Sequence, residues 1–88
     1  MEKNELKGII EAILFAAGRE VSSKELSLSL EKSKDEIEEI IYQMNLEYKD
    51  NNRGIEIVKT EDNYQLATRK EYYEYVYKII DKRNKPKL

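Results

Sequence analysis

The sequence predicts one α+β domain of mainly α-helical content, and three observations support this prediction. The first is a repeated helix-start signal. A hydroxyl residue followed three positions later by Glu is typical of a capping box, in which each side chain binds the other residue's backbone N–H. Such boxes begin at Ser22, Ser33 and Thr68. Val21 and Leu26 add a hydrophobic staple to the first box.

The second observation is the spacing of apolar residues in four segments. Intervals of three and four place them on one helix face in each segment. In the first segment, Asn4 is a plausible cap, and Gly18 suits the left-handed residue that ends a helix. The buried faces predicted for the first, third and last helices are, in that order, Leu6, Ile9, Ile10, Ile13, Leu14 and Ala17; Ile37, Ile40, Ile41, Met44 and Tyr48; and Tyr72, Val76, Ile79 and Ile80.

The third observation is a short hairpin pattern. Ile55 and Ile57 alternate with polar neighbours, as do Tyr64 and Leu66, and Glu61-Asp62-Asn63 separates the two runs. Each strand is therefore expected to bury one face. The resulting order, helix, helix, helix, hairpin, helix, is that of a winged helix-turn-helix with a two-stranded wing. The expected helices span residues 5–17, 23–30, 34–49 and 69–81, and the strands span 55–60 and 64–67.

Length and composition indicate a small domain with a close balance of charge. We expect residues 1–81 to form the winged-helix domain and the basic residues 82–88 to form a linker. The 88 residues carry 16 basic and 18 acidic side chains, a net charge of −2, which gives no general attraction to phosphate. No segment has the length or flanks of a membrane span or a signal peptide. A cytoplasmic location without membrane contact is the expectation.

The residue inventory argues against an enzyme. His and Cys are absent, which removes the commonest general base, the thiolate nucleophile and the usual zinc ligands. Ser22 and Ser33 are assigned to capping boxes, and Ser23 adjoins the first. The sequence therefore predicts no catalytic residue, cofactor or metal.

The third helical segment is poorly suited to DNA. In a helix-turn-helix it would enter the major groove, where affinity depends on neutralising phosphates. Residues 33–50 carry two basic side chains against six acidic ones: Asp35, Glu36, Glu38, Glu39, Glu47 and Asp50. The basic residues after position 69 are the counter-evidence, because they fit either a solvated linker or a nucleic-acid arm. A DNA-binding winged helix of a transcription regulator is therefore the alternative function.

Some apolar residues are left over after the core faces are assigned. Ala12 and Phe15 fall opposite the main stripe of the first helix, and Ala16 lies on its flank. Tyr73 and Tyr77 similarly lie off the main stripe of the last helix. These five residues are the candidate protein interface, suited to a second copy or another chain. In the alternative interpretation, Phe15 tucks under the turn at residues 18–20 and the tyrosines are tolerated surface residues.

Three segments resemble the segregation and condensation protein B family. They are residues 10–22 (IEAILFAAGREVS), 54–58 (GIEIV) and 64–72 (YQLATRKEY), which occur in the family's order and spacing. The resemblance implies a bacterial cytoplasmic protein with two tandem winged-helix domains and no enzymatic activity. It further implies a homodimer that binds the kleisin subunit of a structural maintenance of chromosomes complex. The expected role is an accessory subunit of this condensin-type complex in chromosome condensation and segregation.

The chain is shorter than the members of that family. Residues 82–88 look like the junction to a second winged-helix domain that this sequence does not include. Kleisin binding that depends on the second domain cannot be carried over from the resemblance. Self-association through the first domain is the property that we expect to remain.

Overall fold

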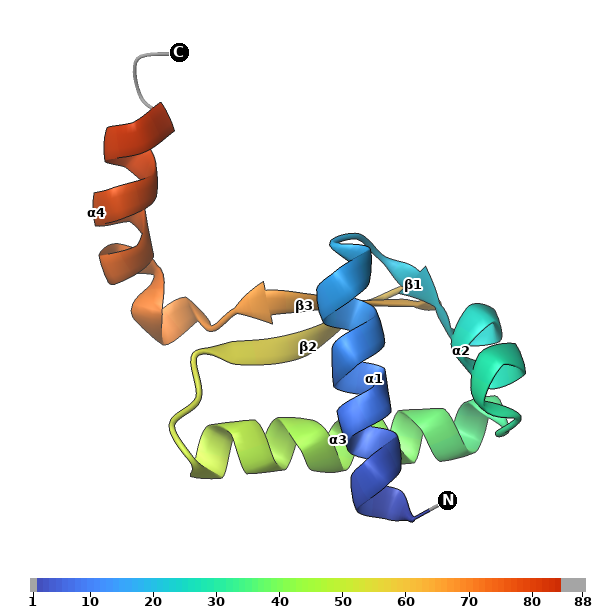
Figure 1. The fold of residues 1–88 in the computed structure, drawn as a ribbon. Helices are drawn as coiled ribbons and strands as arrows, with labels where there is room; N and C mark the ends of the chain where they lie inside the picture. Colours follow the sequence, from blue (N-terminus) through green and yellow to red (C-terminus); the bar gives the residue numbers. More distant parts are fainter. Residues whose placement is uncertain (1, 85–88) are drawn as a thin grey trace.

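The computed structural model describes residues 2–84, in which three helices pack with a small sheet and a fourth helix stands apart (Figure 1). The predicted order of elements is confirmed. Two predicted elements, the second helix and the first hairpin strand, have the predicted bounds. The elements are α1 (Lys3–Ala17), β1 (Val21–Ser22), α2 (Ser23–Leu30), α3 (Lys34–Asp50), β2 (Ile55–Thr60), β3 (Asn63–Thr68), the 3₁₀ turn η1 (Lys70–Tyr72) and α4 (Tyr73–Asn84).

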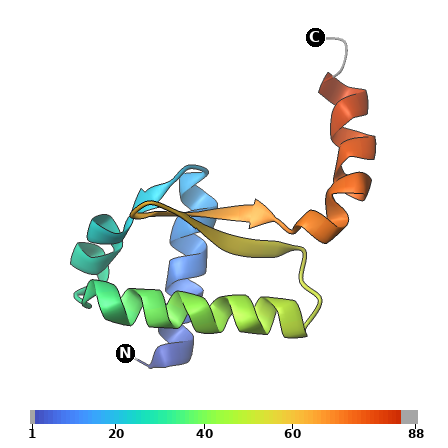
Figure 2. The ribbon, with the colours of Figure 1, turned by 180° about the vertical axis from the view of Figure 1, so that it is seen from behind.

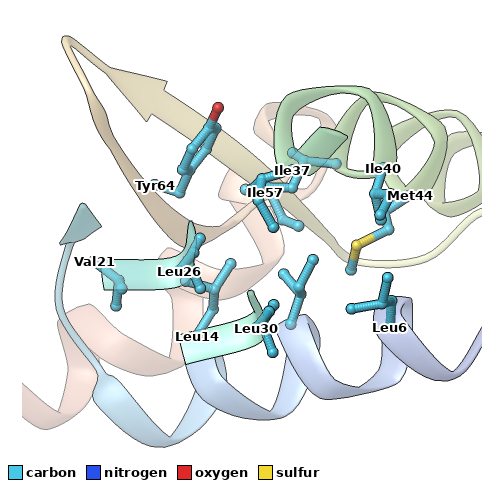
Figure 3. Close-up of a cluster of buried hydrophobic side chains, with 12 residues drawn as sticks. Leu6, Leu14, Val21, Leu26, Leu30, Ile37, Ile40, Met44, Ile57 and Tyr64 are labelled. Carbon is cyan, nitrogen blue, oxygen red and sulfur yellow. The ribbon is translucent and has the colours of Figure 1, made fainter. Parts of the chain in front are cut away.

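One hydrophobic core joins α1, α2, α3 and the sheet. Its side chains point into a common interior between the helices and the strands (Figure 3). The predicted inner faces of α1 and α3 supply most of it, with Ile9, Ile13, Ala17 and Tyr48 packed at its edge. The buried residues are Leu6, Ile10, Leu14, Val21, Leu26, Leu30, Ile37, Ile40, Ile41, Met44, Ile57 and Tyr64.

Two of the three predicted capping boxes are present. The Ser22 hydroxyl accepts from the Glu25 N–H at 3.0 Å, and the Glu25 carboxylate accepts from the Ser22 N–H at 2.9 Å. Ser33 and Glu36 form the same pair, at 3.1 Å in both directions. The hydrogen bond from each capping residue's backbone lowers the pKa of Glu25 and Glu36 below the ordinary value of 4.5.

The C-terminal end of α1 was predicted correctly, whereas its N-terminal end was not. Gly18 has φ 61° and ends the helix in the left-handed conformation, as expected. The prediction of Asn4 as the cap is wrong, because α1 begins at Lys3. Glu2 occupies the capping position, without a side-chain hydrogen bond.

The wing hairpin pairs with a third strand, β1, that the sequence did not indicate. β3 is central in the order β1-β3-β2, and both of its neighbours are antiparallel to it. Val21 lies opposite Tyr64, and the Ser23 N–H donates to the Asp62 carbonyl at 2.8 Å. β1 has only two residues, too few for alternation to reveal a strand. Its pairing ties the start of α2 to the hairpin.

The free edge of β2 is paired by a side chain of α3. The Asn45 amide donates to the Ile57 carbonyl at 2.9 Å, and its oxygen accepts from the Ile57 N–H at 2.8 Å. The amide therefore does for the edge strand what a neighbouring strand would do. This pair of hydrogen bonds fixes the sheet against α3 while the Ile57 side chain enters the core.

The predictions for the C-terminal helix are wrong in two respects. Thr68 is the last residue of β3, so the third capping box does not form, and Arg69 occupies the position before η1 without a side-chain cap. The predicted burial of the last helix also fails: Ile79 is 59% exposed, Ile80 is 44% exposed, and Tyr72 and Val76 are half-buried. Physically, α4 starts beyond the end of the sheet and points away from the other helices (Figure 2).

The boundary between domain and linker remains a prediction. α4 continues to Asn84, three residues into the segment expected to be the linker. Residues 85–88 lie outside the described residues.

Asn45→Ala is expected to destabilise the domain by about 1–3 kcal/mol, because it leaves the Ile57 N–H and carbonyl without partners in a half-buried position. Urea unfolding followed by circular dichroism measures this difference. Gln43→Ala, two residues earlier on the same helix, is the control and should cost much less. Equal costs for both variants would contradict the assigned role of Asn45.

The capping boxes predict a dependence of stability on pH. Because folding lowers the pKa of Glu25 and Glu36, their contribution is present above about pH 4.5 and is lost as the pH falls through the lowered values. In the variant Glu25→Gln/Glu36→Gln, the amides can still bind the capping backbone but do not titrate. Its midpoint of urea unfolding should therefore change less between pH 7 and pH 3 than that of the parent. Glu31→Gln, outside both boxes, is the control and should keep the parental slope.

Candidate protein interface

The outer face of α1 is apolar and uncovered. Leu6, Ile10 and Leu14 fill the inner face, and the periodicity of the helix turns Ala12, Phe15 and Ala16 outward. Phe15 is 80% exposed, the highest value among the exposed large apolar side chains of the described residues. The alternative interpretation, in which Phe15 tucks under the turn at residues 18–20, is therefore wrong. The exposure of all three residues agrees with the sequence analysis.

Glu11, which borders this face of α1, is tied to α3. The Tyr48 hydroxyl donates to its carboxylate at 2.7 Å, which joins the two helices across the edge of the core. Partial burial, followed by the hydrogen bond to Glu11, raises the pKa of Tyr48 well above its ordinary value. Tyr48 therefore remains a donor at neutral pH and keeps the Glu11 carboxylate bound to α3.

A shallow groove of about 260 Å³ lies between α1 and the sheet. Gly8 is one of its lining residues, and a Cβ there would meet no atom within 4 Å. Ile55 and Leu66 were expected to be buried like Ile57 and Tyr64, but they are only half-buried, because the groove beside α1 leaves them partly open. The lining residues are Gly8, Glu11, Ala12, Phe15, Ile55 and Leu66.

The predicted tyrosines form a second surface on α4. The ring centroids of Tyr73 and Tyr77 are 5.5 Å apart, with the rings tilted by 39°. Tyr77 is 49% exposed, whereas Tyr73 is half-buried. The fold thus places the five candidate residues on two elements, α1 and α4, and both views show these helices apart (Figures 1 and 2).

Sequence reasoning missed several exposed apolar residues. Tyr75 is 61% exposed on α4, and Tyr42 and Leu46 are 61% and 45% exposed on α3. For Tyr42 and Leu46 a signal was available, because both fall outside the stripe defined by Ile37, Ile40 and Met44. For Tyr75 and Ile79 none was available, since only the tertiary fold shows that α4 has no helix of its own domain beside it.

The face of α3 that would read DNA presents carboxylates. Glu38 and Glu39 are exposed, as predicted. Two nearby lysines are already in ion pairs, Lys59 with Glu38 at 3.1 Å and Lys34 with Asp62 at 3.4 Å. The hydrogen bond to Glu38 raises the pKa of Lys59. These lysines offset charge within the wing and α3, so this surface does not form a basic patch for phosphates.

Residues 2–84 contain no group of three or more Asp, Glu, His or Cys side chains that could hold a metal ion. Within the same range, each helix falls short of the length and apolar character needed to cross a membrane.

The sequence matches that of a known family over most of its length. The sequence model of the family described as "Segregation and condensation complex subunit ScpB" matches residues 8–88. The chain belongs to this family. The resemblance noted in the sequence is thereby confirmed.

The relatives in the ScpB family are longer than this chain. It is 42% identical over 90 residues to segregation and condensation protein B of Clostridioides difficile, covering all of this chain and 50% of the relative. The chain spans about half the length of the curated relatives that it matches.

Solved ScpB structures confirm the winged-helix fold. ScpB from Mycobacterium tuberculosis superimposes with a TM-score of 0.81 at 24% identity, covering 91% of this chain and 50% of that one. A second structure is a dimer of an ScpB N-terminal domain complexed with ScpA peptide. Its TM-score is 0.78 at 34% identity, and the match covers 86% of this chain and 95% of that one.

Proposed function

We propose that this chain is a non-enzymatic accessory subunit of a condensin-type complex, which dimerises and binds the kleisin subunit in chromosome condensation and segregation. The observation that carries the proposal is the match to the ScpB N-terminal domain dimer with its ScpA peptide. The alignment covers 95% of that chain at 34% identity. Dimerisation and peptide binding are thus properties of a relative of nearly the same extent as this domain.

The proposed interface residues are Ala12, Phe15 and Ala16 on α1, with Tyr73 and Tyr77 on α4. A largely exposed Phe is costly in water, and a partner's surface that covers it gains the corresponding hydrophobic free energy. Aromatic residues are also enriched where proteins meet, because they combine a large apolar area with few rotatable bonds. Both features support protein contact as the role of these faces.

The rest of the assignment follows from chemistry and family. The absence of His and Cys from the sequence and the use of the Ser22 and Ser33 hydroxyls as caps support a non-enzymatic role. Family membership supports a cytoplasmic site of action, close to the chromosome through the complex. It also supports residues 82–88 as a linker toward a second winged-helix domain.

Phe15→Glu is expected to convert a dimer into a monomer, because it places a charge in the apolar contact on α1. Light scattering behind a sizing column across a concentration series measures the mass. The far-ultraviolet circular dichroism should be unchanged, since Phe15 is 80% exposed and contributes little to the core.

Leu28→Glu is the matched control for this experiment. Leu28 is 70% exposed on α2, away from both proposed faces, so its variant should keep the dimer mass. A monomeric parent, or loss of the dimer in both variants alike, would contradict dimerisation through α1.

A labelled ScpA peptide should bind the domain saturably in a fluorescence anisotropy titration, whereas a labelled DNA duplex at low salt should not. The acidic face of α3 is the reason for the second expectation, because exposed Glu38 and Glu39 would repel phosphates. Duplex binding that weakens steeply with salt, without peptide binding, would favour the transcription-regulator alternative.

A further inference from the structure

α4 is apolar around more of its circumference than one contact can cover. At 100° per residue, its apolar positions occupy more than half of the helix surface, and Glu74 and Lys78 lie on the remaining side. A helix of this kind is stable in water only when other surfaces cover it from more than one direction. The apolar residues are Tyr73, Tyr75, Val76, Tyr77, Ile79 and Ile80, preceded by Tyr72 of η1.

The domain supplies this cover only in part, since Tyr73 and Val76 are half-buried while other apolar residues of α4 are exposed. α4 makes its main contacts with the short turn η1 that precedes it. Tyr75 and Ile79 are 61% and 59% exposed on one side, and Tyr77 is 49% exposed on another. The Lys78 ammonium lies 5.4 Å from the Tyr75 ring centroid and shields only part of it.

The direction of α4 is set by contacts at its base. The Arg69 N–H donates to the Gly54 carbonyl at 2.9 Å, and the Tyr72 N–H donates to the Arg69 carbonyl at 3.0 Å. The Arg69 side chain is only 11% exposed and pairs with Glu71, whose hydrogen bond raises the pKa of Arg69. These contacts hold the start of α4 to the end of the sheet, so the helix stands out from its own domain (Figure 1).

A complementary surface lies on the same molecule at the same end of the sheet. Ile55, which lines the groove beside α1, is paired with Thr68, the residue just before the base of α4. The groove is open above Gly8 and is bordered by exposed Phe15. One chain therefore carries both an uncovered apolar helix and an uncovered apolar groove.

The area required for a dimer favours using both surfaces. A stable interface takes about 800 Å² from each partner, whereas one aromatic side chain supplies roughly 150–250 Å². Phe15 with two alanines cannot reach that value alone. α4 is about 18 Å long at 1.5 Å per residue, and its tyrosines and isoleucines supply the missing area.

We propose that two copies of this domain exchange their C-terminal helices, with α4 of each copy lying in the groove between α1 and the β2–β3 sheet of the other. The proposal rests on dimerisation as proposed above and names its mode. The exchange is reciprocal, as a twofold interface requires. It covers one side of α4 with the partner's groove and brings the α1 faces of the two copies within the same contact.

The test uses pairs of single-cysteine variants, since the natural sequence contains no Cys. Gly8→Cys places a thiol in the groove, where a Cβ meets no atom within 4 Å. Tyr77→Cys places one on the apolar side of α4, the side that would face the groove, at a position that is 49% exposed. The two variants are mixed, treated with a short thiol cross-linker and separated by denaturing electrophoresis, with one copy tagged so that mixed dimers are distinguished. The control mixture replaces Gly8→Cys by Leu28→Cys, an exposed position on α2.

Helix exchange predicts mixed cross-linked dimers several-fold above the control mixture. A parent of dimer mass whose cross-linking does not exceed the control would overturn helix exchange and leave dimerisation standing. A parent of monomer mass at every concentration would overturn both dimerisation and helix exchange. Binding of the ScpA peptide is measured separately and does not depend on either result.

Discussion

The arrangement of the domain depends on the pair of hydrogen bonds between the Asn45 amide and the backbone of Ile57. They attach the edge of a three-stranded sheet to α3, while β3 pairs with the other edge of the same strand. The amide fixes the edge strand to α3, while Val21, Ile57 and Tyr64 pack the inner face of the sheet against the helices. The end of β3, and with it the point where α4 leaves the domain, follows from the position of the sheet.

The two sides of α1 have different roles: the inner side forms part of the core, and the outer side is exposed for contact with another chain. The inner face of α1 is completely buried at Ile10, whereas its outer face exposes Phe15 almost fully. The outer residues contribute little to stability, so they are available for contact with another chain. The surface that would normally meet DNA is different in character, because α3 is acidic and the nearby lysines pair with carboxylates. The chemistry of both helices therefore suits protein partners in a fold often associated with nucleic acid.

Much of the fold could be predicted because the decisive signals are local. The boxes at Ser22 and Ser33, the left-handed Gly18 and the alternation in β2 each depend on a few adjacent residues. The third box failed because Thr68 has the right neighbours but is used by β3, whose pairing with Ile55 is not local. The apolar pattern of α4 indicated a helix correctly, yet periodicity cannot say whether the covering surface belongs to the same chain. The exposed face of α1 could be predicted because the inner and outer apolar residues lie on one continuous helix, where periodicity alone separates the two faces.

The Arg69 side chain, which is 11% exposed and pairs with Glu71, fixes the base of α4. The helix behaves as a lever about 18 Å long, so a rotation of about 10° at its base displaces its far end by about 3 Å. The position of the far end of α4 therefore depends on the Arg69 guanidinium and on the turn η1 at the base of the helix. Small changes at this hinge are amplified with distance, and the core of the domain does not have to move.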